Sequence, residues 1–299
     1  MRWKGRRVSS NLEDRRGGGG AKAGGISILG LVVAFVAWKF FGVDPQQAYQ
    51  ATKQVTSNNQ QQAIGIENPT PEQQETAAFV GTVLADTEDT WTTVFQKQGM
   101  QYQAPKLVMF SGVVNSGCGT AQSAMGPFYC PADQKIYIDT DFFKDMRQQM
   151  GISGERNQSE LSTQNAAGDF AQAYVIAHEV GHHIQNLLGI STQVQQARQR
   201  ATEAQGNQLS VRLELQADCL AGVWAKDTHQ RTQFLEQGDV EEAMDAAHKI
   251  GDDYLQKKAR GHVVPDSFTH GTSQQRMYWF DRGMKTGDVN QCDTFNTSI

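Results

Sequence analysis

The stretch His178-Glu179-Val180-Gly181-His182 has the pattern H-E-x-x-H, and it decides how the rest of the chain is interpreted. Residues four positions apart lie on one face of an α-helix, so the imidazoles of His178 and His182 can reach the same metal ion. Glu179 beside them can act as a base toward a water molecule that the ion activates. A chain with 7 histidines in 299 residues produces this pattern by chance in roughly one case in a hundred, so the motif needs support from elsewhere in the sequence.

Two histidines do not complete a catalytic zinc site, because such a site usually has three protein ligands and keeps a fourth position open. One group of zinc peptidases continues the motif as H-E-x-x-H-x-x-G-x-x-H, but the later positions here are Gln185 and Leu188. A glutamate from a later helix is the alternative. Glu214 is the best candidate, and Asp218 lies four residues further along the same helical face.

These two carboxylates predict a division of roles. The longer Glu214 can reach the ion, and the shorter Asp218 can accept a hydrogen bond from the outer ring nitrogen of a ligand histidine, with His178 favoured. Leu213 and Trp224 belong to the apolar part of this segment. Buried carboxylates in such surroundings need partners, which zinc and imidazole would supply. The competing interpretation is a solvated helix face, which is the usual location of helical carboxylates.

Other residues near the motif have structural interpretations. His183, five positions after His178, is rotated off the ligand face and is expected to be a packing or surface histidine. Gly181 costs a helix about 1 kcal/mol relative to alanine, so it indicates the close approach of another backbone. The chain has no C-x-x-C pair, which argues against a cysteine-based zinc site.

The charge distribution separates the N-terminal region from the rest of the chain. The formal net charge of -5 argues against a nucleic-acid partner. Positive charges cluster in residues 1–22, and the apolar stretch 23–43 that follows suits one membrane crossing of ~20 residues. Basic residues before such a span predict a cytoplasmic N-terminus and an exported, periplasmic remainder at the bacterial inner membrane.

The composition therefore predicts four regions along the chain. Residues 1–22 form a disordered basic cytoplasmic tail, 23–43 a single transmembrane anchor, 44–75 a Gln-rich linker and 76–299 the folded domain. A cleaved signal peptide is one alternative, but the bulky Trp-Lys-Phe-Phe that ends the apolar stretch offers no small-residue cleavage site. A buried soluble helix is the other alternative, and a Gly-rich run on one side and a Gln-rich segment on the other are unusual neighbours for it.

The 4 cysteines fit an exported domain, because an even number in an oxidising compartment indicates disulfides. Cys118 and Cys130 are close in sequence, so their pairing is favoured by proximity. The pairing of Cys219 with Cys292 then follows by elimination. The alternative for Cys219 is an inert thiol on a buried helix face.

The periodicity of residues 76–299 predicts an α+β fold, mainly helical with a small sheet. The stretches Lys106–Gly112 and Lys135–Asp139 are expected to be strands, and the cysteine-bracketed segment between them a hairpin-like excursion. The motif helix is expected at about Ala166–Leu188, with Gly189 as its C-cap. The other expected helices are one that ends near Gly99 and those at about Asp141–Met150, Ser210–Lys226 and Val240–Arg260.

Four blocks of the sequence resemble the bacterial family of neutral zinc metallopeptidases. They are GPFYCPADQKIYID (126–139), HEVGHHIQ (178–185), ELQAD (214–218) and FTHGTSQQR (268–276). The resemblance extends from the basic start of the chain to the last cysteine. It implies a zincin-like domain of the glutamate-zinc class behind one membrane span, with His178, His182 and Glu214 as Zn²⁺ ligands and Glu179 as base.

The expected activity is zinc-dependent hydrolysis of peptide bonds, for which the developing oxyanion needs a further donor. His270 is the first candidate, and His262, Tyr174 and Arg276 are alternatives. The segment 126–139 is expected to present an edge strand that aligns an extended peptide. The alternative function is a membrane-anchored binding or assembly-assisting protein with structural zinc, but structural sites usually have four protein ligands and leave no role for Glu179.

Overall fold

The computed structural model of the protein describes residues 1–17, 68–122, 126–152 and 168–299. The predicted membrane span at 23–43 and most of the predicted linker at 44–75 lie outside these residues. Within the described parts of the chain, we find no helix that combines the length and the apolar character needed to cross a bilayer.

The strands form a four-stranded sheet with the order β1-β2-β6-β5 and a separate hairpin of β3 and β4. Strand β2 pairs in parallel with both β1 and β6, whereas β5 pairs antiparallel to β6 and occupies one edge. Their bounds are Leu12–Asp14 (β1), Lys106–Phe110 (β2), Val113–Ser116 (β3), Gly119–Gln122 (β4), Phe128–Cys130 (β5) and Lys135–Asp139 (β6).

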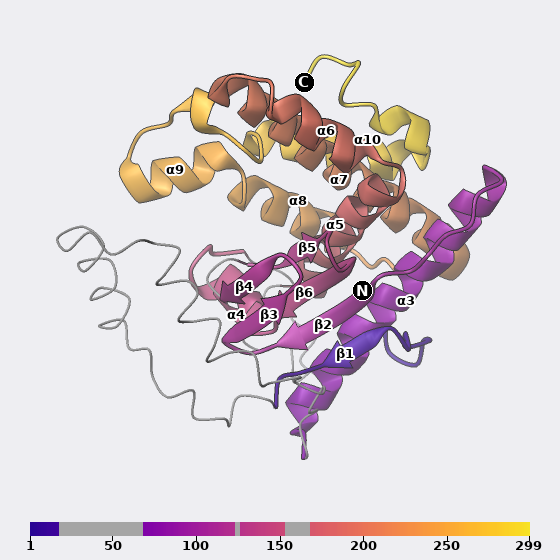
Figure 1. The fold of residues 1–299 in the computed structure, drawn as a ribbon. Coiled ribbons are helices and arrows are strands. Elements are labelled where there is room, and N and C mark those ends of the chain that lie inside the picture. The colour runs from indigo at the N-terminus through magenta and orange to yellow at the C-terminus, as the bar shows by residue number, and fades with distance from the viewer. Residues whose placement is uncertain (18–67, 123–125, 153–167) are drawn as a thin grey trace, which may run out of the picture.

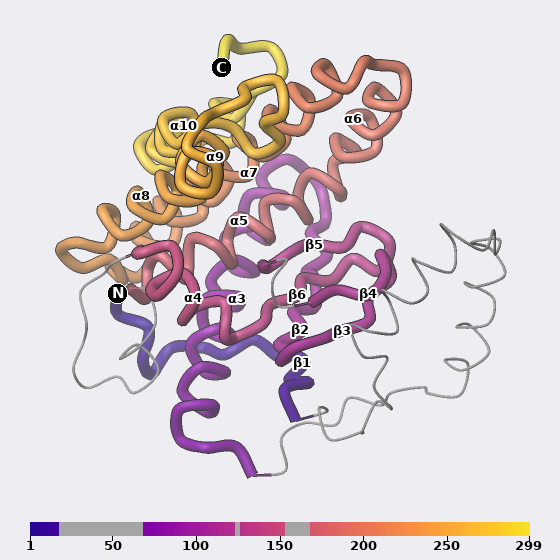
Figure 2. Tube along the Cα trace, turned by 90° about the vertical axis from the view of Figure 1, so that its left-hand side faces the viewer, coloured from indigo at the N-terminus to yellow at the C-terminus, as the bar shows by residue number. Residues whose placement is uncertain are grey.

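Most of the described residues are helical. The helix α5 lies between the sheet and the layer that contains α7 and α10 (Figures 1 and 2). The α-helices are Pro71–Lys97 (α3), Phe142–Gln148 (α4), Asp169–Leu187 (α5), Ile190–Arg198 (α6), Glu203–Thr232 (α7), Asp239–Lys249 (α8), Asp252–Arg260 (α9) and Ser273–Thr286 (α10). Two 3-10 turns, Pro265–Ser267 (η2) and Val289–Cys292 (η3), follow α9 and α10. The prediction of a mainly helical α+β fold with a small sheet is therefore confirmed.

Local sequence signals explain where several helices begin. Thr70, Thr202 and Thr272 each cap a helix N-terminus, with a glutamine three residues later that completes the capping box. Gly189 has a φ of 75°, which lets the chain leave α5 and enter α6 in the left-handed region where glycine carries no penalty. The core beneath these helices is aromatic-rich and includes Trp224, which is fully buried.

One of the expected helices is wrong. The stretch Val240–Arg260 forms two helices, α8 and α9, because the chain turns at Gly251. A Cβ at Gly251 would lie 2.4 Å from the backbone nitrogen of Ser273, so the turn brings two backbones into a contact that another residue would prevent. The strands at 106–110 and 135–139 and the motif helix are confirmed, whereas α6 and α10 were not expected.

Both predicted disulfides are present. The bond between Cys118 and Cys130 joins the turn between β3 and β4 to the end of β5, with a Cα–Cα distance of 5.8 Å. The bond between Cys219 and Cys292 ties α7 to η3, with a Cα–Cα distance of 5.5 Å. A disulfide restricts the unfolded chain more than the folded one, so both bonds stabilise the domain.

Residues 1–17 are not a disordered tail, because they pack against the folded domain along α3 and the sheet (Figure 2). Strand β1 extends the sheet through its pairing with β2, and the ring of Trp3 is buried against Phe79 at a centroid distance of 5.5 Å. Arg6 Nη2 lies 2.6 Å from Asp86 Oδ1. The sequence did not predict this packing, because the partners of these polar residues are about 70 or more positions away.

The packing places residues 1–17 and the folded domain on the same side of any membrane. We therefore expect cysteines introduced at Val8 and Val113, which are 49% and 61% exposed, to show the same accessibility in intact cells. In intact cells, a membrane-impermeant maleimide should either label both single variants or label neither of them. In the second case, both should become labelled after lysis. All four native cysteines are in disulfides and give no background. Labelling of one position with protection of the other would contradict the shared side.

Candidate active site

Two helices bring the predicted ligands together. His178 and His182 come from α5, and Glu214 comes from α7, which packs directly against it. The helices approach closely because Gly181 faces Ala217: a Cβ at Gly181 would lie 3.0 Å from the Ala217 Cα. The prediction that this glycine marks the close approach of another backbone is confirmed.

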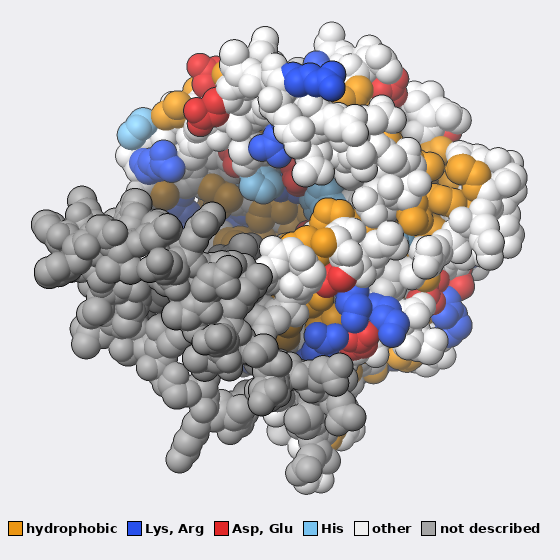
Figure 3. Space-filling model, in the orientation of Figure 1, with side chains coloured by type: hydrophobic (Ala, Val, Ile, Leu, Met, Phe, Trp, Pro, Cys, Tyr) orange, Lys and Arg blue, Asp and Glu red, His pale blue; other side chains and the backbone are white. Residues whose placement is uncertain are grey.

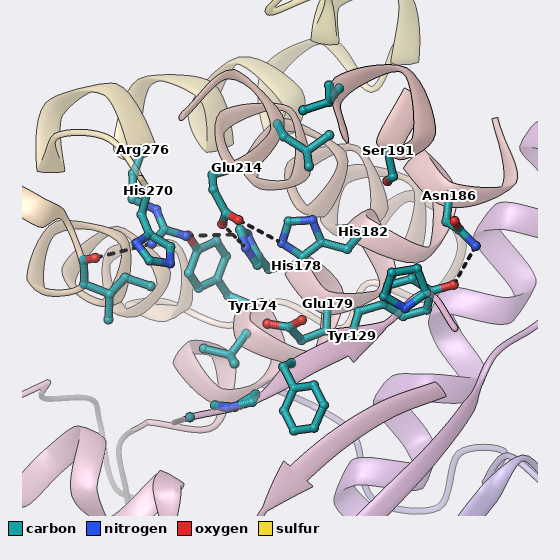
Figure 4. Close-up of a pocket in the computed structure, with 18 of the residues that line it drawn as sticks. Tyr129, Tyr174, His178, Glu179, His182, Asn186, Ser191, Glu214, His270 and Arg276 are labelled. Atoms are coloured by element: carbon teal, nitrogen blue, oxygen red, sulfur yellow. Dashed lines mark hydrogen bonds and ion pairs between the residues drawn. The ribbon is translucent and has the colours of Figure 1, made fainter. Parts of the chain in front are cut away.

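The ligand atoms of the three residues converge on one point (Figure 4). The Nε2 atom of His178 lies 3.1 Å from Glu214 Oε2, and the Nε2 atom of His182 lies 3.4 Å from Glu214 Oε1. Ligand atoms bound to one tetrahedral zinc ion stand roughly 3.3 Å apart, given bond lengths of about 2.0–2.2 Å. The donor set fits a zinc ion, and both separations from the Glu214 oxygens are close to those of a tetrahedral site.

Asp218 orients His178 as the sequence predicts. Its Oδ1 atom lies 2.8 Å from His178 Nδ1, which leaves the opposite ring nitrogen for a metal. The same carboxylate accepts hydrogen bonds from the Tyr174 hydroxyl at 2.5 Å and from Arg276 Nε and Nη2, both at 2.9 Å. Burial alone would raise the pKa of Asp218, but Arg276 and His178 outweigh it and hold the pKa at about 2. Asp218 is therefore an anion that fixes the ring of His178.

His182 is oriented by a residue that the sequence analysis did not select. Gln185 Oε1 lies 2.9 Å from His182 Nδ1, and the amide nitrogen of Gln185 donates to the carbonyl of Leu213 at 2.6 Å. The Nδ1 atom of His182 is therefore held by a neighbouring side chain, as that of His178 is, and its Nε2 atom faces Glu214. The feature of the sequence that could have identified this role is the spacing, because Gln185 lies one helical turn after His182 and its side chain can reach back to the ring.

The electrostatics of the ligand set favour ligation. Burial would raise the pKa of Glu214, but the neighbouring His182 and His178 outweigh it and lower the pKa well below its ordinary value. Glu214 is therefore ionised, as a metal ligand must be. Its negative charge compensates for the positive charge of an ion among buried residues.

Glu179 differs from the other carboxylates of the site. The residue is 7% exposed and lines the cleft. Its carboxylate makes no hydrogen bond or ion pair with another described residue. Burial raises its pKa, against the opposing influence of His182 and His178. A carboxylate whose pKa is shifted toward neutrality, and which has no structural partner, has the properties of a general base.

The site opens into a cleft of about 700 Å³. Figure 3 shows this hollow, with histidine and apolar side chains at its base. His270 lines the cleft and is held by Asp252, whose Oδ1 atom lies 3.2 Å from His270 Nδ1. Tyr174 and Arg276 also line it, but both are bound to Asp218, whereas His262 is exposed and is not among the residues that line it.

His183 is a packing residue, as expected. It is fully buried, and its ring nitrogens contact the Tyr129 hydroxyl at 3.1 Å and the carbonyl of Gln103 at 2.7 Å. Burial lowers the pKa of His183, so its ring is neutral. It joins α5 to β5 and takes no part in the metal site.

Together, two histidines, a glutamate and a second glutamate without a partner among the described residues have the composition and arrangement of an H-E-x-x-H metal site beside an open cleft. A family model described as "Putative neutral zinc metallopeptidase" matches residues 1–295, so the chain belongs to this family. YpfJ of Escherichia coli K12, described as uncharacterized, is 50% identical over 309 residues that cover 100% of both chains. Rv2575 of Mycobacterium tuberculosis H37Rv, also described as uncharacterized, is 44% identical over 206 residues, which are 66% of this chain and 64% of its own length. No solved structure matches the chain.

The contact at Gly181 leads to a prediction about zinc affinity. Gly181→Ala places a methyl group 3.0 Å from the α7 backbone, so α5 and α7 must separate by a few tenths of an ångström. We expect roughly tenfold weaker zinc binding, the factor that corresponds to ~1.4 kcal/mol, measured by competition with a chelator.

Gly206→Ala is the matched control for this substitution, because its nearest neighbour atoms are 3.8 Å away. It should leave zinc binding unchanged and stabilise α7 by up to ~1 kcal/mol. Equal zinc affinity in both variants would show that the helix separation does not set the site geometry.

Proposed function

We propose that the protein is a zinc-dependent endopeptidase of the glutamate-zinc class. The observation that carries the proposal is Glu179, a buried carboxylate that lines the cleft next to His178, His182 and Glu214 and has no hydrogen-bond or ion-pair partner in the part of the chain that the structure describes. The family to which the chain belongs supports a peptidase, and therefore a peptide or protein as substrate.

The residues of the site supply the steps of hydrolysis. His178, His182 and Glu214 would hold a zinc ion, which would supply a lowered pKa for water and polarisation of the scissile carbonyl group. Glu179 accepts the proton of the attacking water and passes it to the nitrogen of the leaving amine. The raised pKa of Glu179 suits both transfers, because the group must release the proton that it has taken up.

His270 is proposed to stabilise the developing oxyanion. The carboxylate of Asp252 holds its Nδ1 atom and accepts hydrogen bonds from the backbone nitrogens of Thr269, His270 and Gly271 at 2.6–3.0 Å. The hydrogen bond that His270 donates to the Asp252 carboxylate raises the pKa of His270, which favours the charged form as a donor. Anchoring of both the loop and the ring distinguishes His270 from a merely solvated histidine.

An extended substrate is proposed to bind along β5. This strand is an edge of the sheet, and its residues Phe128 and Tyr129 line the cleft. A peptide that pairs with a free strand edge gains backbone hydrogen bonds whatever its sequence. The disulfide at Cys130 and the hydrogen bond from Asn186 to the Tyr129 hydroxyl, at 3.0 Å, stiffen the strand.

The location outside the cytoplasm is also a proposal. Its support is the pair of disulfides, which persist in oxidising compartments and are rare in the cytosol. Membrane attachment through the apolar stretch 23–43, which lies outside the described residues, is proposed on its sequence alone. Because β1 before this stretch and β2 after it share one sheet, the stretch would have to enter and leave the membrane on the same side.

The decisive test compares two substitutions in the zinc-loaded protein. Glu179→Gln keeps the size of the side chain and removes the base, so we expect hydrolysis of an unfolded protein substrate to fall at least ~100-fold, the lower range for general-base catalysis. Zinc content should stay at one ion per chain, measured by atomic emission.

Glu214→Ala is the complementary variant. Loss of the carboxylate ligand should lower zinc content at equal total zinc, together with activity. Full activity of Glu179→Gln would contradict the mechanism. Zinc bound by a wild-type protein that hydrolyses no peptide would favour the alternative of a binding or assembly-assisting protein.

A further inference from the structure

The cleft has two ends of different chemical character, on either side of the ligand triad. The apolar end is lined by Ile250 and Leu255, which flank the turn at Gly251, and by Val175 near the start of α5. The polar end is lined by Asn186, Ser191, Thr192, Gln195 and Arg198. Figure 4 shows Asn186 and Ser191 on one side of the ligand residues, and His270 and Arg276 on the other. Ile250 belongs to the second side, because its carbonyl accepts a hydrogen bond from Arg276 at 3.4 Å.

Helix α5 gives the scale of the cleft, because it runs along the floor from one end to the other. Val175 precedes the first ligand, His178, by three residues, and Asn186 follows the second, His182, by four. At a rise of ~1.5 Å per residue, the eleven steps from Val175 to Asn186 span about 16 Å. An extended peptide covers that distance with about five residues. Each end therefore faces a substrate side chain about two residues from the bond that is cleaved.

The apolar end is suited to a large apolar side chain. Leu255 on α9 is 37% exposed although its neighbour Ile250 is half-buried, and Val175 is 6% exposed. A single exposed leucine is common on protein surfaces, but three apolar residues gathered at one end of a cleft indicate a binding surface. The charged residues near this end, His270 and Arg276, are each paired with a carboxylate. Because their charges are compensated, these two residues do not oppose the burial of an apolar side chain beside them.

The polar end carries an unpaired cation. Arg198 on α6 is exposed and forms no ion pair with any carboxylate of the described residues. The other polar residues of this end are uncharged amides and hydroxyls, and the remaining α6 residue that lines the cleft is the apolar Val194. The other cationic side chains that line the described cleft are paired with carboxylates, Arg276 with Asp218 and His270 with Asp252. Arg198 therefore determines the sign of the charge that this end attracts.

We propose that the protein selects peptides with a large apolar residue at the α9 end of the cleft and an acidic residue at the α6 end, and that Leu255 and Arg198 determine this selectivity. The inference rests on the proposed peptidase function. An acidic side chain would form a charge-assisted hydrogen bond with the guanidinium of Arg198. The apolar side chain would gain by removal from water of its own surface and that of Leu255.

The first experiment profiles cleavage of a diverse peptide library by the full-length, zinc-loaded protein. Leucine, isoleucine, methionine or phenylalanine should be enriched within about two residues on one side of the cleaved bond, and aspartate or glutamate on the other. Cleavage without such enrichment would overturn the proposed selectivity, whereas the proposed peptidase function would still hold. Absence of any cleavage would overturn the proposed function.

Charge reversal tests Arg198. Arg198→Glu should lower kcat/KM for an acidic peptide by roughly tenfold relative to its lysine-containing counterpart, a shift of ~1.4 kcal/mol. Arg200→Glu is the matched control, because Arg200 is an exposed neighbour on the same stretch that does not line the cleft. An equal effect of the two substitutions would mean that only the overall charge matters, and would contradict the role of Arg198.

Leu255→Ala tests the apolar end against Leu188→Ala, an exposed leucine outside this cleft. Only Leu255→Ala should reduce the preference for large over small apolar residues, by about fivefold, a shift of ~1 kcal/mol. The same comparisons can be made as peptide binding in the Glu179→Gln background, by fluorescence polarisation. Unchanged Kd values for matched peptides in the Arg198→Glu and Leu255→Ala proteins would overturn the proposal independently of turnover.

Discussion

A single buried carboxylate, Asp218, holds together the three helices that form the site. It lies on α7, accepts hydrogen bonds from Tyr174 and His178 on α5, and forms an ion pair with Arg276 on α10. Loss of one partner from a buried charge costs several kcal/mol, so the helices cannot shift independently. The same network that aligns a ligand histidine therefore also determines how the helical layer packs, and the geometry of the metal site is inseparable from the fold.

Close backbone approaches provide the second constraint on this layer. A Cβ at Gly222 would lie 2.2 Å from the carbonyl oxygen of Phe280, and one at Gly283 would lie 2.0 Å from that of Cys219. Helices α7 and α10 are therefore in direct backbone contact, and the disulfide from Cys219 to Cys292 fixes the same region. Such contacts leave little freedom for α7, which carries both Glu214 and Asp218. Rigid support of this kind is what a metal-ligand set requires to keep its spacing.

The sequence was sufficient for the residues that act through helical spacing. His178, Glu179 and His182 are arranged by one helix and Glu214 and Asp218 by another, so the 3.6-residue period predicts which of them share a face. The role of Gln185 was not predicted, because an amide that orients His182 has no pattern of its own apart from its position. The break at Gly251 depends on the backbone of α10, which is a contact between distant segments. Local periodicity cannot report such contacts, and the strand register of β1 was missed for the same reason.

The N-terminal segment shows why composition alone is an incomplete guide to membrane topology. Its basic residues suggested a cytoplasmic tail, yet Arg6 pairs with Asp86 and Arg7 with Glu88 and Asp89 on α3. These charges serve the folded domain, and β1 is part of the sheet that leads through β2 and β6 to β5 beside the cleft. The disulfides favour an oxidising environment for that domain. If the domain lies there, a segment that shares its sheet lies there as well, so the basic residues cannot at the same time mark a cytoplasmic end of the folded chain.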